Sequence, residues 1–177
     1  MSSHDSQIEK EKVQIKKEKV LFKKWGDYKE KEYDLKITFQ LGNHIGLNRN
    51  SNDRVKIDIF DKEVFCGKIR IYPYRYKGTI TAEIGNLETV KEYEGMGIGT
   101  FLMARGAEEA KLMGYTKPWF VQIDEKSDNF YGGLMKRFLD RGIQGIIWNL
   151  EEKRFVIDLD KIDFNKVYSM FGYKVFK

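Results

Sequence analysis

The sequence contains few of the residues that build disulfides, zinc sites or proline-rich linkers. Among its 177 residues are one cysteine, Cys66, two histidines, His4 and His44, and two prolines. A single cysteine cannot form an internal disulfide, and so few cysteines and histidines do not make a zinc cluster. We therefore expect no metal site and a reducing compartment, for which the cytoplasm is the simplest choice.

Long apolar segments are absent as well. No run of about 18 consecutive apolar residues occurs, and the opening residues MSSHDSQIEKEK lack the apolar stretch of a secretory signal. Hydrophobic residues nevertheless make up 41 % of the chain and aromatic residues 14 %, which suffices for a packed core. We expect one compact domain in a soluble, cytoplasmic protein without a membrane partner.

The charges are numerous but do not gather in one block. The 32 basic and 27 acidic residues give a net charge of +5. Most of them alternate in sign, as in the segment EKEKVQIKKEK near the N-terminus. Such alternation is typical of a solvated surface, whereas nucleic-acid binding usually needs a denser basic stripe. Nucleic acid is therefore not the partner that we expect first.

The N-terminal residues 1–33 do not show one clear period. Apolar residues such as Val13 and Ile15 alternate as in a charged hairpin, but the many lysines and glutamates also favour a helix, so both structures stay open. We treat 1–33 as a charged extension and 34–177 as the domain.

The region after this extension predicts a largely antiparallel sheet. The segment 42–53 is rich in Gly, Asn, Ser and Asp, so we expect a loop there. Gly85 lies inside a predicted strand and marks a possible bulge, and Cys66 is interpreted as a small core residue rather than a nucleophile. Alternating apolar residues predict strands at 34–41, 55–59, 64–72 and 79–90, with short turns at 61–62 and 75–77.

The second half of the chain predicts helices and further strands. A helix is expected at 100–113, with Gly106 on a face of small residues that packs closely against the sheet. A second helix is expected from a cap at Ser127 or Asp128 to about Asp140. We also predict a strand at 119–123, a hairpin of strands at 143–148 and 154–159, and a short helix at 163–170.

The most informative segment is a glycine-rich loop between a predicted strand and a predicted helix. Glycines alternate with other residues in the stretch Glu94 to Gly99, which leaves backbone N–H groups unshielded beside a helix N-terminus. This pattern favours an anion such as a diphosphate, although a tight turn alone would need one glycine. The residues that follow, Thr100 and Phe101, lack the lysine of an NTPase phosphate loop, and no glycine at 100 or 102 completes a dinucleotide fingerprint.

The stretch LETVKEYEGMGIGTFLMARGAEEA resembles the Arg/Gln-x-x-Gly-x-Gly/Ala motif of the GNAT superfamily, the Gcn5-related N-acetyltransferases. The order of predicted elements resembles that family from about 54 to 159, which is 106 of 177 residues or about 60 % of the chain. The resemblance implies an α/β (α+β) fold in one domain. Its mixed, mostly antiparallel sheet would be flanked by helices and splayed between the fourth and fifth strands.

The resemblance also implies an enzyme, an acyltransferase that moves an acetyl group from acetyl-CoA to a primary amine of a small molecule or protein, without a metal. The pantetheine arm would pair with backbone groups of Leu87 and Thr89. Asn129 would contact acetyl-CoA or, alternatively, satisfy local backbone groups. The loop assigned to the pyrophosphate comprises Glu94, Gly95, Met96, Gly97, Ile98, Gly99 and Thr100.

Catalytic roles follow from the same resemblance. Glu83 stands where the histone acetyltransferase branch has its general base, and Glu88 is the second choice; Glu83 is equally an exposed strand carboxylate. Tyr131 is the nearest tyrosine for protonating the CoA thiolate, but it is also interpreted as a core aromatic. When FLDRGI is matched to the family's helix ending, the tyrosine position falls on Phe138, which has no hydroxyl group.

The sequence departs from the family pattern at two places. Glu94 replaces the usual Arg or Gln and, with Glu92, brings negative charge close to the proposed diphosphate site. The region before Val55 is a polar loop where the family has two helices. The alternative function is therefore a catalytically silent GNAT-like module that binds a partner or nucleic acid through Lys16, Lys17, Lys19, Lys23 and Lys24.

Overall fold

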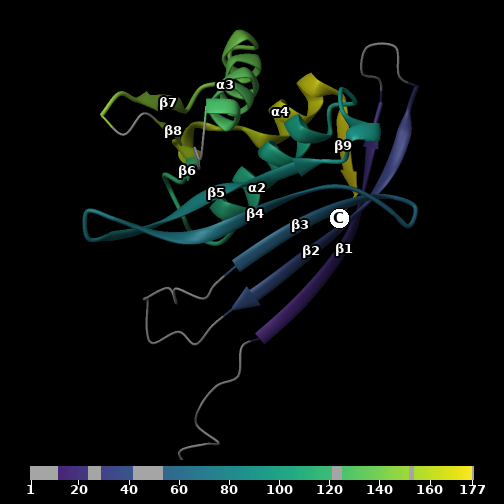
Figure 1. Ribbon diagram of the computed structural model, residues 1–177, viewed down its shortest axis with the longest axis horizontal. Helices are drawn as coiled ribbons and strands as arrows, with labels where there is room; N and C mark the ends of the chain where they lie inside the picture. The colour runs from purple at the N-terminus through teal and green to yellow at the C-terminus, as the bar shows by residue number, and fades with distance from the viewer. Residues whose placement is uncertain (1–11, 24–28, 42–53, 121–124, 152–153, 177) are drawn as a thin grey trace, which may run out of the picture.

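A computed structural model describes residues 12–23, 29–41, 54–120, 125–151 and 154–176 of the chain. The described strands form one sheet in the order β7-β8-β6-β5-β4-β3-β2-β1-β9 (Figure 1). Consecutive strands from β1 to β5 pair antiparallel, while β6 joins β5 in parallel. This mixed, mostly antiparallel sheet with flanking helices confirms the predicted fold class.

The elements have the following bounds. The strands are β1 (Lys12–Phe22), β2 (Lys31–Leu41), β3 (Arg54–Asp61), β4 (Val64–Tyr76), β5 (Thr79–Thr89), β6 (Trp119–Phe120), β7 (Ile146–Asn149), β8 (Arg154–Ile157) and β9 (Tyr173–Phe176). The helices are η1 (Lys91–Tyr93), α2 (Ile98–Leu112), α3 (Glu125–Asp140), η2 (Leu159–Lys161) and α4 (Phe164–Phe171). In the part of the chain so described, no helix combines the length and the apolar composition needed to cross a membrane.

The core lies between α2 and one face of the sheet. Leu35, Ile37 and Ile57 point to that face and are buried, as expected from their alternation with polar residues. A Cβ atom on Gly106 would lie 3.2 Å from Ile69 Cδ1. The close approach of α2 to the sheet that the sequence predicts at Gly106 is therefore confirmed.

The N-terminal strands form a hairpin, which decides between the two structures left open by the sequence. β1 pairs antiparallel with β2 from Lys12 opposite Leu41 to Phe22 opposite Lys31. The boundary expected after residue 33 falls inside β2, and β1 belongs to the same sheet as the rest of the domain. Residues 1–11, 24–28 and the predicted loop 42–53 lie outside the described residues.

Several predicted bounds need correction. α3 begins at Glu125, so Ser127 and Asp128 lie inside the helix and do not cap it. α2 begins at Ile98, two residues before the expected start. The predicted helix at 163–170 is confirmed as α4, where the side chain of Asp163 accepts a hydrogen bond from the Lys166 N–H. The sequence analysis missed β9, which has only four residues and so gives no clear period.

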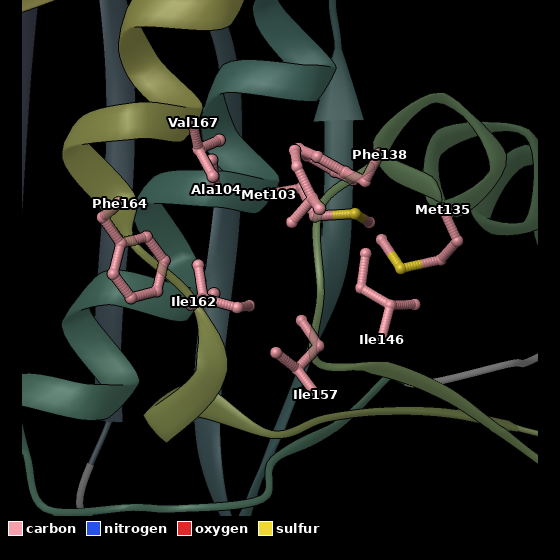
Figure 2. A pocket seen from close by; sticks show the side chains of 11 residues that line it. Met103, Ala104, Met135, Phe138, Ile146, Ile157, Ile162, Phe164 and Val167 are labelled. Atoms are coloured by element: carbon pink, nitrogen blue, oxygen red, sulfur yellow. The ribbon is translucent and has the colours of Figure 1, made fainter. Parts of the chain in front are cut away.

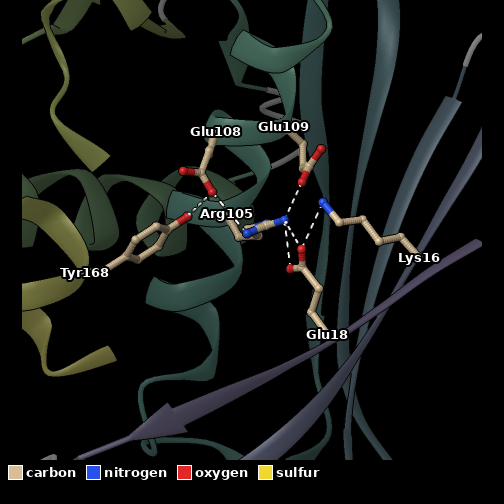
Figure 3. A network of polar contacts seen from close by, with 6 residues as sticks. All are labelled: Lys16, Glu18, Arg105, Glu108, Glu109 and Tyr168. Carbon is tan, nitrogen blue, oxygen red and sulfur yellow. Dashed lines mark hydrogen bonds and ion pairs between the residues drawn. The ribbon is translucent and has the colours of Figure 1, made fainter. Parts of the chain in front are cut away.

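Arg105 of α2 is completely buried and lies in an ion network that joins α2 to β1 and α4 (Figure 3). Its Nη2 atom lies 2.9 Å from Glu18 Oε2 and 2.5 Å from Glu109 Oε1, and its Nη1 atom lies 3.1 Å from Glu108 Oε1. The Tyr168 hydroxyl donates to Glu108 at 3.0 Å. Burial lowers the pKa of Arg105, but the carboxylates raise it by more, so the guanidinium stays charged.

We expect Arg105→Ala to lower the free energy of unfolding by about 3–5 kcal/mol, because Glu18 and Glu109 would remain buried without their counter-charge. Urea denaturation followed by circular dichroism measures this change. Lys111→Ala, which removes an exposed cation from the same helix, is the control and should change stability by less than about 0.5 kcal/mol. Similar losses in the two variants would contradict a structural role for the network.

Candidate functional site

The glycine-rich loop connects the end of β5 to the start of α2. Gly95 and Gly97 have left-handed φ angles of +79° and +86°. A residue with a Cβ atom is strained by about 1–2 kcal/mol in this conformation. The turn by itself thus requires two of the three glycines. Gly99 lies inside the first turn of α2 and has no left-handed φ, so the turn does not explain it.

The N-terminus of α2 presents backbone donors without protein acceptors. Gly97 is the N-cap, no side chain caps the helix, and its first turn contains no acidic residue. Among the described residues, the N–H groups from Gly95 to Thr100 donate no hydrogen bond. Unpaired amides at the positive end of a helix dipole are a favourable environment for an anion.

The loop is exposed at Gly95 and buried at Gly97, Ile98 and Thr100. Glu92 and Glu94 are both exposed. A Cβ atom on Gly95 would have no other atom within 4 Å. The negative charge that the sequence places near the loop therefore has room to turn away from a bound anion.

Besides Tyr33, whose hydroxyl donates to Met96 Sδ at 3.9 Å, two more residues from distant parts of the sequence contact the loop. The buried hydroxyl of Tyr173 on β9 donates to the Gly97 carbonyl at 2.7 Å, and burial raises the pKa of Tyr173 well above its ordinary value. Arg137 of α3 donates from Nη1 to Thr100 Oγ1 at 3.2 Å. No local pattern in the sequence could have identified either contact.

A β-bulge follows Gly85, close to the position that the sequence indicates. Gly85 pairs with Arg70 and Glu88 pairs with Lys68, so Asn86 and the residue after it oppose a single residue of β4. Asn86 has a left-handed φ of 55°. The bulge changes the direction of β5 before it reaches the glycine-rich loop.

The described pairing between β5 and β6 is short. It comprises only Glu83 opposite Trp119 and Ile84 opposite Phe120. Leu87 and Thr89, the residues expected to pair with pantetheine, lie beyond these pairs toward the glycine-rich loop. Thr89 pairs with β4 on its other side.

The two candidate bases each have a cationic partner. Glu83 Oε2 accepts a hydrogen bond from Arg154 Nη1 at 2.7 Å, and the Glu83 side chain is 22 % exposed. Glu88 Oε2 lies 3.4 Å from Lys68 Nζ and its side chain is 54 % exposed. Of the two, Glu83 is the more buried and the more closely held.

The remaining candidates of the sequence analysis divide into two groups. Asn129 and Tyr131 lie in α3, but their side chains are outside the described part of the structure. Cys66 is completely buried in the core and burial raises the pKa of its thiol, which agrees with a packing role. Phe138 is also a core residue, with its ring centroid 5.3 Å from that of Phe171.

The N-terminal lysines named in the alternative function do not share one face. Lys16 lies 2.9 Å from the buried Glu18, on the side of α2. Lys17 and Lys19 alternate with Glu18 and so lie on the other face of the sheet. Lys23 follows β1 and is exposed, and Lys24 lies outside the described residues.

A small apolar cavity of about 20 Å³ lies between α2, α3, α4, β7 and β8 (Figure 2). It has room for about one water molecule but no polar side chain to hold one. This cavity is a packing gap in the core rather than a site for chemistry. Its lining includes Met103, Met135, Phe138, Ile146, Ile157 and Val167.

Comparison with known proteins assigns the chain to a protein family. The model of the acetyltransferase (GNAT) family matches residues 17–133, about two thirds of the chain. No curated protein matches the sequence. The match includes the glycine-rich loop and the whole of β5 and α2.

Solved structures resemble the chain only distantly. They include the KacTA–DNA complex, at 15 % identity and a TM-score of 0.49 over 68 % of this chain and 76 % of that chain. AtaTR bound with AcCoA has 16 % identity and a TM-score of 0.44 over 76 % and 72 %. The PaiA N-acetyltransferase from Thermoplasma acidophilum in complex with coenzyme A has 16 % identity and a TM-score of 0.43 over 59 % of each chain. Likenesses this distant do not identify an acceptor or a partner.

We expect Tyr173→Phe to lower the free energy of unfolding by about 1 kcal/mol, because the Gly97 carbonyl keeps only its bond from the Phe101 N–H. The pKa of Tyr173 is raised in the folded protein, so its contribution is complete below the unfolded pKa of about 10 and is lost at higher pH. Urea denaturation between about pH 6 and pH 11 measures both effects. A difference between the two proteins that grows above pH 10 would contradict this assignment.

Proposed function

Since the chain belongs to the acetyltransferase (GNAT) family, we propose that it transfers the acetyl group of acetyl-CoA to a primary amine. The observation that carries the proposal is the left-handed glycine turn at the N-terminus of α2, whose amides have no acceptor among the described residues. The family match supports acetyl transfer in general. The use of acetyl-CoA, the direct attack and the residue roles below are proposals that rest on the resemblance of the sequence to that family.

The amides from Gly95 to Thr100 are proposed to bind the pyrophosphate. These amides have no acceptor among the described residues, and Glu94 at the edge of the loop is exposed. We assign a second contribution to Arg137, whose guanidinium contacts the buried Thr100 in the first turn of α2. A cation beside the positive end of a helix is unfavourable without a counter-ion, and a bound diphosphate would supply one.

The bulged end of β5 is proposed to bind the rest of acetyl-CoA. Leu87 and Thr89 lie in β5 after Ile84, the last residue described as pairing with β6, and before the glycine-rich loop. We assign to their backbone groups the pairing with the pantetheine arm. Asn129 of α3 is proposed as a further contact. When bound, acetyl-CoA supplies a thioester, an acyl group already activated for transfer.

In the proposed reaction the amine nitrogen attacks the thioester carbonyl carbon, the N–C bond forms and the C–S bond breaks. The amine has an ordinary pKa near 10.4 and must lose a proton first. We assign to Glu83 the role of accepting this proton; Arg154 Nη1 donates a hydrogen bond to the Glu83 carboxylate at 2.7 Å. Tyr131 is assigned the role of donating a proton to the departing thiolate. Backbone N–H groups near the carbonyl oxygen would stabilise its developing negative charge.

Isothermal titration calorimetry with acetyl-CoA tests the binding site. We expect saturable heat for the unchanged protein and none for Gly97→Asp, which adds a side chain and a negative charge to the loop. Gly78→Asp is the control, because Gly78 also has a left-handed φ, of +79°, but lies in the turn between β4 and β5, at the other end of β5 from the glycine-rich loop. Normal binding by Gly97→Asp, or no binding by the unchanged protein, would contradict the proposal.

Arg137→Gln should weaken acetyl-CoA binding about tenfold, because it removes the positive charge beside the proposed diphosphate site. Lys136→Gln changes the charge of the adjacent exposed residue equally and should leave the affinity unchanged. The same calorimetric titration measures both variants. Equal affinities for the two variants would remove Arg137 from the binding site.

Glu83→Gln should lower kcat at neutral pH much more than it weakens acetyl-CoA binding, with recovery as the pH approaches the amine pKa. Arg154→Gln serves as a comparison, because it breaks the same ion pair but leaves the carboxylate in place. The acceptor for the assay comes from a mass-spectrometric screen of amines and peptides with acetyl-CoA. A pH profile of Glu83→Gln parallel to that of the unchanged protein would exclude Glu83 as the base.

A further inference from the structure

A charged groove of about 590 Å³ lies at the far end of the sheet from the β5–β6 pairing. Its volume is within the range of ligand-binding sites. The groove combines cationic and aromatic side chains, which we call the lysine–phenylalanine groove. Its lining includes Lys17, Lys19, Lys36, Lys62, Phe60 and Phe176.

Strand register places the strand residues of this lining on the face of the sheet opposite α2, while Lys62 lies in the turn between β3 and β4. Lys19 pairs with Asp34 on one side and with Phe176 on the other, and Asp34 pairs with Phe60. These four residues form one row across β9, β1, β2 and β3. Their neighbours in sequence point the other way, as the buried Leu35 shows. The sheet therefore separates the groove from α2 and the glycine-rich loop.

The groove has more positive than negative charge. Lys17, Lys36 and Lys62 make no ion pair within the described residues. Lys19 lies 3.5 Å from Glu32 and 3.8 Å from Asp34. Glu18 also borders the groove, but its carboxylate is held by Arg105 on the inner face. Lys17, Lys36 and Lys62, which have no ion-pair partner among the residues described, favour an anionic partner.

The aromatic side chains narrow the class of partner. The Phe176 side chain is 43 % exposed at one end of the row, and the half-buried Phe60 lies at the other. Three strand spacings separate them, or about 14 Å. Aromatic rings beside cations on a sheet are typical of surfaces that stack the bases of single strands.

We propose that the lysine–phenylalanine groove binds single-stranded nucleic acid, with phosphates on Lys17, Lys36 and Lys62 and bases on the two phenylalanine rings. A duplex keeps its bases stacked away from such rings, and an acidic peptide has no bases to stack. Both would bind through the lysines alone. The proposal is independent of acetyl transfer, because the groove and the glycine-rich loop lie on opposite sides of the sheet.

Fluorescence anisotropy with a labelled oligothymidylate tests the proposal. The triple variant Lys17→Gln, Lys36→Gln, Lys62→Gln should bind at least tenfold more weakly, and the slope of log affinity against log salt should decrease by about 2. The matched control changes Lys111, Lys136 and Lys166 to Gln, three exposed lysines on the helices. It has the same net charge as the groove variant and should bind as the unchanged protein does.

The aromatic contribution is tested separately. Phe176→Leu should weaken binding about tenfold without changing the salt slope, because stacking is lost and no charge changes. Circular dichroism should show both groove variants folded, and their calorimetric response to acetyl-CoA should equal that of the unchanged protein. A failure of acetyl-CoA binding in every protein would contradict the proposed function and not the groove.

Four results would overturn the proposal. The first is that the unchanged protein does not bind the oligothymidylate, and the second is that the two triple variants lose affinity equally. The third is that a duplex of the same length or an oligoglutamate peptide binds as tightly as the single strand. The fourth is that Phe176→Leu binds the oligothymidylate with unchanged affinity, which would reduce the groove to a site of general electrostatic attraction.

Discussion

The left-handed turn at Gly97 is the constraint on which the rest of the candidate site depends. It brings the chain from β5 into α2, and the first amides of the helix have no acceptor in the part of the chain that the structure describes. The Tyr173 hydroxyl holds the Gly97 carbonyl from β9, so the C-terminal strand fixes the orientation of the loop. A Cβ atom at Gly67 would lie 2.6 Å from the Glu88 carbonyl oxygen and 3.3 Å from Ile98 Cγ2, so β4 must have a glycine beneath the first turn of α2.

The buried Arg105 network provides the complementary constraint at the middle of α2. It links the helix to β1 through Glu18 and to α4 through Glu108 and Tyr168. Because these groups are buried, the network is strongly destabilised when one member is lost, and it fixes which elements pack together. Both constraints join α2 to the two ends of the chain, since β1 and β9 are neighbours in the sheet. The position of the glycine-rich loop is thus set by residues near both termini.

The sequence predicts local features well and long-range contacts poorly. Alternation found the strands that bury one face, and the glycine pattern found the loop and the start of α2 within two residues. The partners of the site come from elsewhere: Arg137, Arg154 and Tyr173 lie 37, 71 and 76 residues from the groups that they contact. Only tertiary packing brings such residues together, and β9 is too short to show a period of its own. The sequence analysis also missed the Arg105 network, since a charged residue on a helix usually predicts a solvated face.

Amide hydrogen exchange measured with and without acetyl-CoA, at residue resolution by NMR, tests the account most directly. The amides from Gly95 to Thr100 have no acceptor within the described residues, so in the free protein they should exchange faster than those in the middle of α2. If they bind a diphosphate, saturating acetyl-CoA should slow their exchange at least tenfold, with smaller effects on α4. Binding that protects other segments and leaves these amides unchanged would contradict the account.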